Sequence, residues 1–208
     1  MDAQRRVADR RSRFEQVVFR WNSYITEQKI APPECFISYA WGNPEHERWV
    51  EHSLATDLLK AGITVVLDRW ENRRIGASIP RFIERAGECD RILVVGTPLY
   101  WTKYQNKDPM LPYVTAAEGD LIGNRLMGTE AGKEAVLPLL LEGTDKTAFP
   151  TMLHGRVYAD FRQIEQYFDT MFELILSLYQ IPSRHPVAED LRRSLQSTIQ
   201  NPGDRISI

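Results

Sequence analysis

The hydrophobic residues of this chain form short continuous runs, separated by segments in which they recur every three or four positions. The runs at 36–41, 65–67 and 91–97 are typical of strands that are buried on both faces of a sheet. Residues 49–59 carry apolar side chains at helical spacing, and Gly62 stands where that helix would end. The pattern therefore predicts a strand, a helix and a second parallel strand.

A second helix and two more strands complete the pattern. Ser78 is a suitable N-cap residue, and Pro80 is tolerated in the first turn of a helix that precedes the third strand. Apolar runs at 136–141 and 155–160 predict a fourth and a fifth strand, although Pro138 favours a bulge or a sheet edge. Right-handed crossovers place helices on both faces of such a sheet. We therefore expect an α/β fold, a flavodoxin-like five-stranded parallel sheet with helices on both faces.

Helical segments flank the central domain, which is expected at 34–181 and ends in a helix with an apolar stripe over 164–179. The N-terminal extension, 1–33, carries an amphipathic seam that Arg11 interrupts, formed by Val7, Phe14, Val18, Trp21 and Ile25. Fewer than four heptads are present, so packing on the chain's own domain is favoured over self-association. The C-terminal tail, 182–208, predicts a shorter amphipathic helix that docks on the domain or leads toward a partner, through Val187, Leu191, Leu195 and Ile199.

Composition sets broader limits on function. The chain has 208 residues, of which 43% are hydrophobic, which is enough for one full core but hardly for two. The net charge of −2 gives no general attraction to nucleic acid or to an anionic membrane. The basic first turns lack interleaved aromatic residues, so they are better explained as a solvated helix face than as a nucleic-acid arm.

Cysteine usage and hydropathy indicate a cytoplasmic protein. Cys35 and Cys89 are far apart in sequence and each lies beside a predicted strand, which supports neither a disulfide framework nor a thiolate zinc site. No apolar run approaches the roughly 18 residues that a membrane span requires. The arginine-rich start also lacks the apolar block of a signal peptide.

Several common catalytic motifs are absent from the sequence. No G-x-G-x-x-G follows the first strand and no G-x-x-x-x-G-K-[ST] occurs, which disfavours dinucleotide redox chemistry and P-loop phosphoryl transfer. His46-Glu47 is not followed by the second histidine of an H-E-x-x-H zinc motif. We therefore expect no metal site and no bound cofactor.

Polar and aromatic residues follow two successive strands at the point where each strand ends. In an open parallel sheet, ligands bind outside the carboxyl ends of the strands, so residues that follow two strands can line one crevice. The residues expected to meet there are Ser38, Tyr39, Trp41, Asp68 and Trp70. A further aromatic group, which includes Tyr100, Trp101 and Tyr104, follows the third strand.

Three motifs occur in one order along the chain: F-I-S-Y-A-W at 36–41, L-L-K-A-G-I-T-V-V-L-D-R-W at 58–70, and I-G-A-S-I-P-R-F-I-E-R-A-G-E-C-D-R-I-L-V-V-G-T-P-L-Y at 75–100. Their order and spacing resemble the bacterial Toll/interleukin-1 receptor (TIR) domain family, close to its SEFIR-like branch. The resemblance extends over roughly residues 34–180. It implies that the loop at 68–78 contacts a neighbouring subunit in assemblies, with the assembly residues Arg73, Arg74 and Gly76.

The resemblance also implies a catalytic carboxylate. In enzymatic members of the family, a glutamate in the segment after the third strand cleaves the nicotinamide–ribose bond of NAD, and Glu118 takes that place here. Sequence position alone would leave Glu118 an ordinary helix-surface acid, with Glu130 and Glu134 as equal candidates. Some family enzymes carry a tryptophan four residues before this glutamate, whereas this chain has Val114 there and Tyr113 one position earlier.

The chemistry explains why one carboxylate can suffice. Nicotinamide leaves NAD as a neutral molecule, so the general acid of common glycosidases is dispensable, and the carboxylate stabilises a ribosyl cation or forms a transient covalent bond. The cationic nicotinamide ring favours an aromatic face, with a contribution of about 0.5 to 2 kcal/mol. The candidates for this face are Trp41, Trp70, Tyr100 and Trp101.

We therefore expect a TIR-domain NAD+ hydrolase for which NAD+ is a substrate and not a cofactor. The resemblance implies an effector of bacterial antiphage immunity that is activated by homotypic assembly or by a separate sensor protein. The main alternative is a non-catalytic TIR or SEFIR interaction module that uses the same strand-exit loops for assembly. A nucleotide-processing enzyme of related fold, such as a deoxyribosyltransferase, is less favoured.

Overall fold

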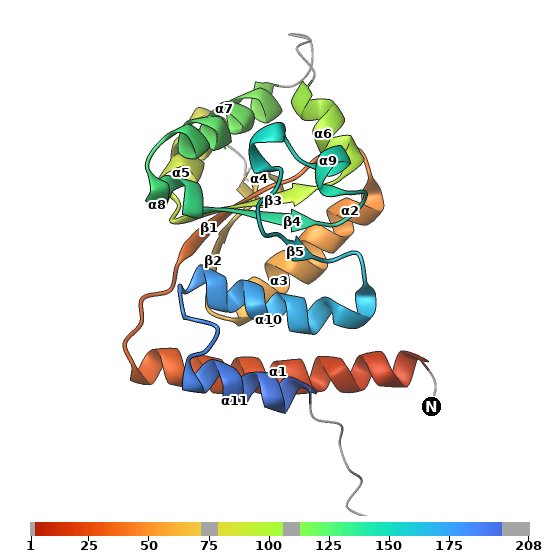
Figure 1. Cartoon of the computed structure of the whole chain (residues 1–208), viewed down its shortest axis with the longest axis vertical. Helices are drawn as coiled ribbons and strands as arrows, with labels where there is room; N and C mark the ends of the chain where they lie inside the picture. Colours follow the sequence, from red (N-terminus) through yellow and green to blue (C-terminus); the bar gives the residue numbers. More distant parts are fainter. Residues whose placement is uncertain (1–2, 72–78, 106–112, 197–208) are drawn as a thin grey trace, which may run out of the picture.

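A computed structural model describes residues 3–71, 79–105 and 113–196 of the chain (Figure 1). One sheet runs through the centre in the order β2-β1-β3-β4-β5, and every pair of neighbouring strands is parallel. This is the strand order of the flavodoxin-like fold that the sequence predicted. The strands are β1 (Glu34–Ser38), β2 (Thr64–Val66), β3 (Arg91–Gly96), β4 (Val136–Leu140) and β5 (Ala159–Asp160).

Successive residues of each strand contribute to different hydrophobic clusters. Cys35 and Ile37 of β1 belong to one cluster, whereas Phe36 belongs to the other. In β3, Leu93, which pairs with Ile37 of β1, lies in the first cluster, and its neighbour Ile92 lies in the second. This alternation follows from the two-residue period of a strand, and it requires that both faces of the sheet be covered.

One face of the sheet is covered by a single layer of helices, which lies above the sheet in Figure 1. Ala86, Tyr100, Ile122 and Ala148, from four different helices, are buried in the cluster on this face. The helices after β2, β3 and β4 on this side are α5 (Ile79–Glu88), α6 (Pro98–Gln105), α7 (Tyr113–Met127), α8 (Glu130–Glu134) and α9 (Asp145–Ala148).

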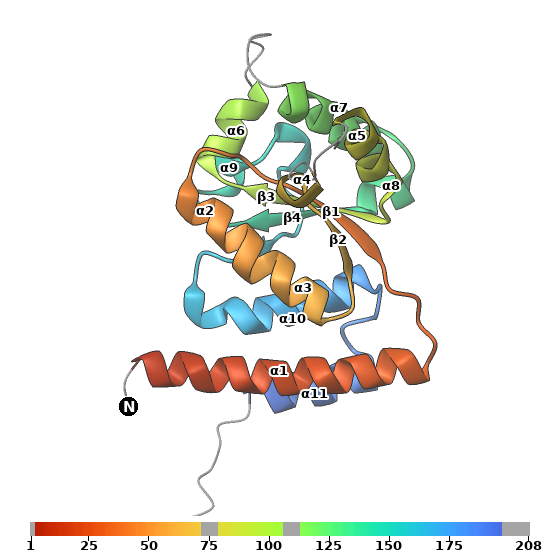
Figure 2. The ribbon, with the colours of Figure 1, turned by 180° about the vertical axis from the view of Figure 1, so that it is seen from behind.

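The opposite face carries two successive layers of helices (Figures 1 and 2). The layer next to the sheet contains α10 (Tyr167–Leu178) and a helical rod formed by α2 (Pro44–Trp49), the π-helix η1 (Val50–Ala55) and α3 (Thr56–Lys60). Outside α10 lies a second layer of two helices, α1 (Ala3–Glu27) and α11 (Pro186–Gln196).

Burial of α10 between the sheet and the outer helices explains its composition. Phe168, Met171, Phe172 and Ile175 are all buried, and polar positions are few in this helix. A helix that is apolar on most of its circumference is stable in water only when other elements cover it on several sides. The predicted stripe over 164–179 is thus core, except that Ile164 lies in a short 3-10 helix and is 70% exposed.

Helix α1 packs on its own domain, as the sequence analysis favoured. Phe14, Trp21 and Ile25 of the predicted seam are buried, but Val7 is 49% exposed, and Val17, outside the seam, is buried instead. The seam was predicted with coiled-coil spacing, whereas α1 packs against both α10 and α11 and therefore buries a wider stripe.

Arg11 interrupts the apolar seam because it binds a buried carboxylate. Its Nη1 lies 2.5 Å from Oδ1 of Asp57 on α3, and the Asp57 side chain is only 1% exposed. The Tyr167 hydroxyl donates a hydrogen bond of 2.9 Å to the other oxygen of Asp57. The Arg11 guanidinium also lies 4.8 Å from the ring centroid of Phe168, so this cation joins α1 to both α3 and α10.

The expected bulge at Pro138 is wrong, whereas the expected edge holds locally, on the side of β4 that faces β5. Pro138 lies in the interior of β4, and the register from Val136 to Leu140 against β3 is continuous. The proline is tolerated because β5 pairs only with Leu139 and Leu140, so no described strand requires an amide donor from Pro138 on that side. The fifth strand is also shorter than the predicted run at 155–160.

The C-terminal helix α11 also packs on the rest of the chain. Helix α11 occupies the predicted C-terminal amphipathic segment, and Ala188, Leu191 and Leu195 are buried against the rest of the chain, while Ile199 lies outside the described residues. None of the helices in the described part of the chain is long and apolar enough to cross a membrane.

Candidate functional site

The end of β1 is tied to the start of α6 inside the molecule. The hydroxyl groups of Ser38 and Tyr100 lie 3.1 Å apart, and the two residues are 0% and 2% exposed. The Thr97 side chain, which precedes α6, accepts a hydrogen bond of 3.0 Å from the Tyr100 backbone N–H and so caps the helix. Two predicted site residues are therefore brought together, and their contact joins β1 to the exit of β3.

Exposure to solvent increases along the residues that follow Ser38. Tyr39 is 6% exposed and packs in the cluster on the α10 side, whereas Trp41 is 44% exposed. Gly42 has φ +110°, a backbone conformation that residues with a side chain rarely adopt. The glycine therefore permits the sharp turn that presents Trp41 at the carboxyl edge of the sheet.

This turn is held by hydrogen bonds from two helices. The Lys103 ammonium of α6 donates to the Trp41 carbonyl oxygen. The Gly42 N–H donates to Oε1 of Glu47 on α2 over 2.8 Å. Asn43 caps α2 by accepting hydrogen bonds from the backbone N–H groups of residues 45 and 46. The start of α2 and the Trp41 turn thus form one bonded unit.

A histidine of α2 joins this helix to the residues that follow β4. Nε2 of His46 lies 3.3 Å from Oε2 of Glu142, and the His46 side chain is 17% exposed. The exits of β1, β3 and β4 are therefore bonded to one another through α2 and α6. Such cross-connections fix the relative positions of strand ends that the sheet itself leaves unbonded.

The exit of β2 carries a buried carboxyl group. Asp68 begins the short helix α4 (Asp68–Glu71) and is 5% exposed, and burial raises the pKa of its carboxyl above the ordinary value. Trp70 is half-buried and packs against the cluster on the α10 side. The predicted assembly residues Arg73, Arg74 and Gly76 lie outside the described residues.

The aromatic group after β3 forms a stacked row on α6. The ring centroids of Tyr100 and Tyr104 are 6.4 Å apart, and those of Trp101 and Tyr104 are 5.9 Å apart. Burial, and secondarily the negative charge of Asp120 on α7, raise the pKa of the Tyr104 hydroxyl. Tyr104 therefore remains protonated near neutral pH, and Trp101 is half-buried beside it.

Glu118 lies in the second turn of α7, the helix that follows α6 on the single-layer face of the sheet. Its side chain is outside the described part of the structure. The first turns of a crossover helix lie nearest the carboxyl ends of the strands, which is the edge where Trp41 is presented.

A metal-binding cluster or a reactive thiol among the described residues would be a further candidate site. No group of three or more His, Cys, Asp or Glu side chains among the described residues could hold a metal ion. Cys35 and Cys89 are free and buried, and burial raises the pKa of the Cys89 thiol to about 12, so both fit the expected structural thiols.

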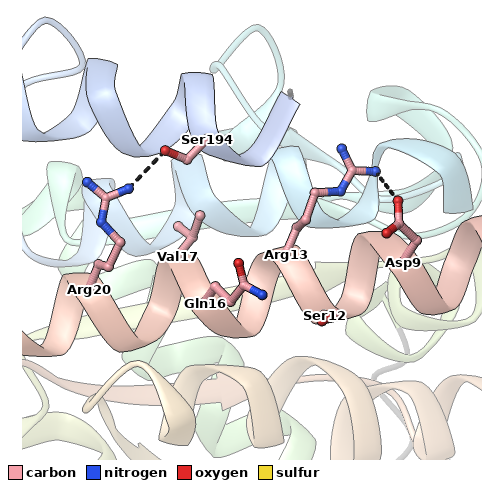
Figure 3. Close-up of a pocket in the computed structure, with 7 residues that line it drawn as sticks. All are labelled: Asp9, Ser12, Arg13, Gln16, Val17, Arg20 and Ser194. Carbon is pink, nitrogen blue, oxygen red and sulfur yellow. Dashed lines mark hydrogen bonds and ion pairs between the residues drawn. The ribbon is translucent and has the colours of Figure 1, made fainter. Parts of the chain in front are cut away.

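A pocket between α1 and α11 lies in the outer helical layer, which α10 separates from the sheet (Figures 1 and 3). Arg13 and Arg20 are its cations, and they are bonded to Asp9 and to Ser194 within the pocket. Arg20 also pairs with Asp190. Because these charges are matched within the chain, we assign the pocket to the packing of the outer helices.

Sequence reasoning missed the residues that hold the Trp41 turn. The Asn43-Pro44 pair is a strong helix-start signal, and a glutamate in the turn after such a start often bonds back to the backbone, which could have identified Glu47. Lys103 lies 62 residues from its partner, and no local pattern could have predicted that bond.

Comparison with known proteins agrees with this fold. The TIR domain family model matches residues 35–176, which is more than half of the chain. A crystal structure of a prokaryotic SEFIR domain has a TM-score of 0.54 and 23% sequence identity, and the match covers 70% of this chain and 98% of that one. Among curated proteins, none matches the chain. The matched residues do not include α1 or α11, and the chain belongs to the TIR domain family.

Proposed function

We propose that this chain is a TIR-domain NAD+ hydrolase that cleaves the bond between nicotinamide and ribose. The observation that carries the proposal is the exposed indole of Trp41, presented on a bonded turn at the carboxyl edge of a parallel sheet. Ligands of this fold class bind at that edge. A tryptophan face attracts a cationic ring such as oxidised nicotinamide.

Glu118 is the proposed catalytic residue, and the proposal for it rests on the family resemblance and on its place in α7. The bond between ribose C1′ and the nicotinamide nitrogen breaks, and its electron pair stays on the neutral nicotinamide that leaves. The Glu118 carboxylate would stabilise the positive charge on the ribosyl group, directly or as a covalent adduct. Water then adds at C1′ and loses a proton.

The direct test of this proposal is the Glu118→Gln variant. It removes the negative charge and keeps the shape, so we expect nicotinamide release from NAD+ to fall by at least about 10²-fold, as when other electrostatic stabilisers are removed. Glu130→Gln is the matched control, because Glu130 is an exposed acid on α8. Turnover by Glu118→Gln near the wild-type rate would show that another carboxylate acts.

We further propose that activity depends on self-association or on a separate activating protein, as for an effector of bacterial antiphage defence. If the competent conformation is rare in the monomer, association increases activity by binding that conformation preferentially. Nicotinamide release should then rise more steeply than linearly across a protein dilution series that is monitored by light scattering. A specific activity that stays constant down to concentrations at which the protein is monomeric would contradict this dependence on association.

A second candidate is a non-catalytic interaction module, which the similarity to the SEFIR domain favours. In this case the strand-exit loops would serve homotypic assembly alone. The same dilution series separates the two functions. Assembly without nicotinamide release, with NAD+ present and at every protein concentration, would support the module.

A further inference from the structure

The Trp41 side chain is not held in place by burial. It is 44% exposed, whereas Trp70 and Trp101 are half-buried against neighbouring side chains. An exposed side chain keeps most of its conformational freedom unless its backbone is fixed, and ordering it on binding has an entropic cost. The position of the Trp41 ring therefore depends on how firmly the backbone at 41–42 is held.

Two side chains hold this backbone from different helices. Lys103 donates to the Trp41 carbonyl oxygen, and Glu47 accepts from the Gly42 N–H over 2.8 Å. Both bonds involve a charged group, and such bonds are stronger than neutral ones. They act on the two sides of a single peptide unit, because the Trp41 C=O and the Gly42 N–H belong to the same amide plane.

Fixing one amide plane from both sides determines its orientation about the chain. Gly42, with φ +110°, allows many backbone conformations, so without these bonds the plane could rotate. An alanine Cβ at Gly42 would lie 3.8 Å from Nζ of Lys103, which shows how closely the ammonium covers the turn. The two charges therefore restrict a turn that the glycine alone would leave adjustable.

We infer that Lys103 and Glu47 are positioning residues, which orient the Trp41–Gly42 amide plane so that the exposed indole stacks on the nicotinamide ring of the substrate. This inference rests on the proposed function and names residues that act through another group. Because the Lys103 ammonium is directed at a carbonyl oxygen, its role differs from that of a cation that binds the substrate's phosphates.

The test compares paired variants of each residue. Lys103→Met and Glu47→Leu remove the bond to the backbone, whereas Lys103→Arg and Glu47→Gln keep a donor or an acceptor. Glu45→Gln is the control, because Glu45 is exposed on the same first turn of α2 and only its backbone N–H takes part in the cap. The two ligands are NAD+ and nicotinamide riboside, which contains the nicotinamide ring but no phosphate.

Two readouts are needed, one of which does not depend on turnover. Fluorine NMR of protein labelled with 5-fluorotryptophan gives a line for each of the five tryptophans, and the Trp41→Phe variant assigns the line of Trp41. Adding either ligand should shift this line. Lys103→Met and Glu47→Leu should weaken both ligands about five- to ten-fold and raise the KM for NAD+ equally, with kcat nearly unchanged, because each loses one charged hydrogen bond.

The conservative variants should restore most of the binding, and Glu45→Gln should match the wild type. Loss of NAD+ binding with normal binding of nicotinamide riboside would overturn the inference, since Lys103 would then contact phosphate. Unchanged binding in both Lys103→Met and Glu47→Leu would also overturn it. If neither the wild type nor any variant releases nicotinamide, but the Trp41 line still responds to the ligands as expected, the inference stands and the proposed hydrolase activity is wrong.

Discussion

Two buried aspartates, Asp57 and Asp68, lie in different surroundings. Asp57 lies on the face with two helical layers, where it is 1% exposed and accepts bonds from Arg11 and Tyr167. Asp68 lies at the carboxyl edge of the sheet, is 5% exposed, and has a pKa raised by burial. A cation and a hydroxyl group bind the first carboxylate, and burial raises the pKa of the second.

This difference separates the double-layer face of the molecule from the edge of the sheet that carries the candidate site. On the double-layer face, charge and apolar packing act together to hold α1 on a helix that would otherwise expose large hydrophobic side chains. At the sheet edge, the structure retains a carboxyl group whose charged form burial disfavours and a tryptophan that is 44% exposed. Perturbed groups of this kind are frequent at functional sites.

The largest expected effect is on the double-layer face. Trp21 of α1 is 1% exposed and lies edge-on to Tyr179 with ring centroids 5.1 Å apart. Trp21→Ala should lower the free energy of unfolding by about 3–5 kcal/mol, measured by urea denaturation, because it removes a large buried ring. Phe19→Ala on the same helix is the control, since Phe19 is 73% exposed and should change stability by no more than about 0.5 kcal/mol. Equal effects of the two variants would mean that α1 is not docked.

A smaller effect is expected when the Asp57 pair is broken. Arg11→Met keeps an apolar contact with Phe168 but removes the nearer of two cations from the Asp57 carboxylate, leaving the Lys60 ammonium at 3.9 Å. We expect a loss of about 1–3 kcal/mol in unfolding free energy, because the buried Asp57 carboxylate loses its closest cation, while water already screened part of this pair at the 34% exposed Arg11. Arg20→Met, in a pair whose side chains are 51% and 48% exposed, should have almost no effect. Similar losses in both variants would remove the distinction between buried and exposed pairs.

The smallest effect on the free energy of unfolding is expected from a substitution of Asp68. This substitution should stabilise the protein, whereas the two preceding ones destabilise it. Since burial raises the pKa of this carboxyl in the folded state, folding favours the protonated form. The wild type therefore loses stability as the pH rises from the ordinary carboxyl pKa through the raised value. Asp68→Asn cannot ionise, so it should be more stable than the wild type at pH 7, by less than the Arg11→Met loss, and the gap should close in acid.

Urea unfolding at several pH values between about 4 and 8 checks this prediction. Glu130→Gln provides a control of opposite sign, because Lys133 lowers the pKa of the exposed Glu130 carboxyl. That variant should be slightly less stable than the wild type at neutral pH. A gap between Asp68→Asn and the wild type that does not change with pH would contradict the proposed cost of ionising Asp68.

The sheet edge illustrates how far the sequence could predict the site. Ser38 and Tyr100 were both singled out, and the structure brings their hydroxyl groups together, but inside the molecule and not on an open surface. Trp41 was one aromatic candidate among four, and burial distinguishes it from the others. Local pattern gives the order of residues along a strand exit, whereas the depth of each side chain depends on what covers it.

The sequence by itself determined the five strands, the parallel sheet and the family, because these depend on local periodicity and on motifs of fixed spacing. Only the tertiary structure decided why Arg11 interrupts an apolar seam and why Pro138 is tolerated inside β4. Both answers depend on partners distant in sequence: Asp57 lies 46 residues from Arg11, and β5 begins to pair one residue after Pro138. Distant partners of this kind are brought together by folding, and no pattern along the chain identifies them.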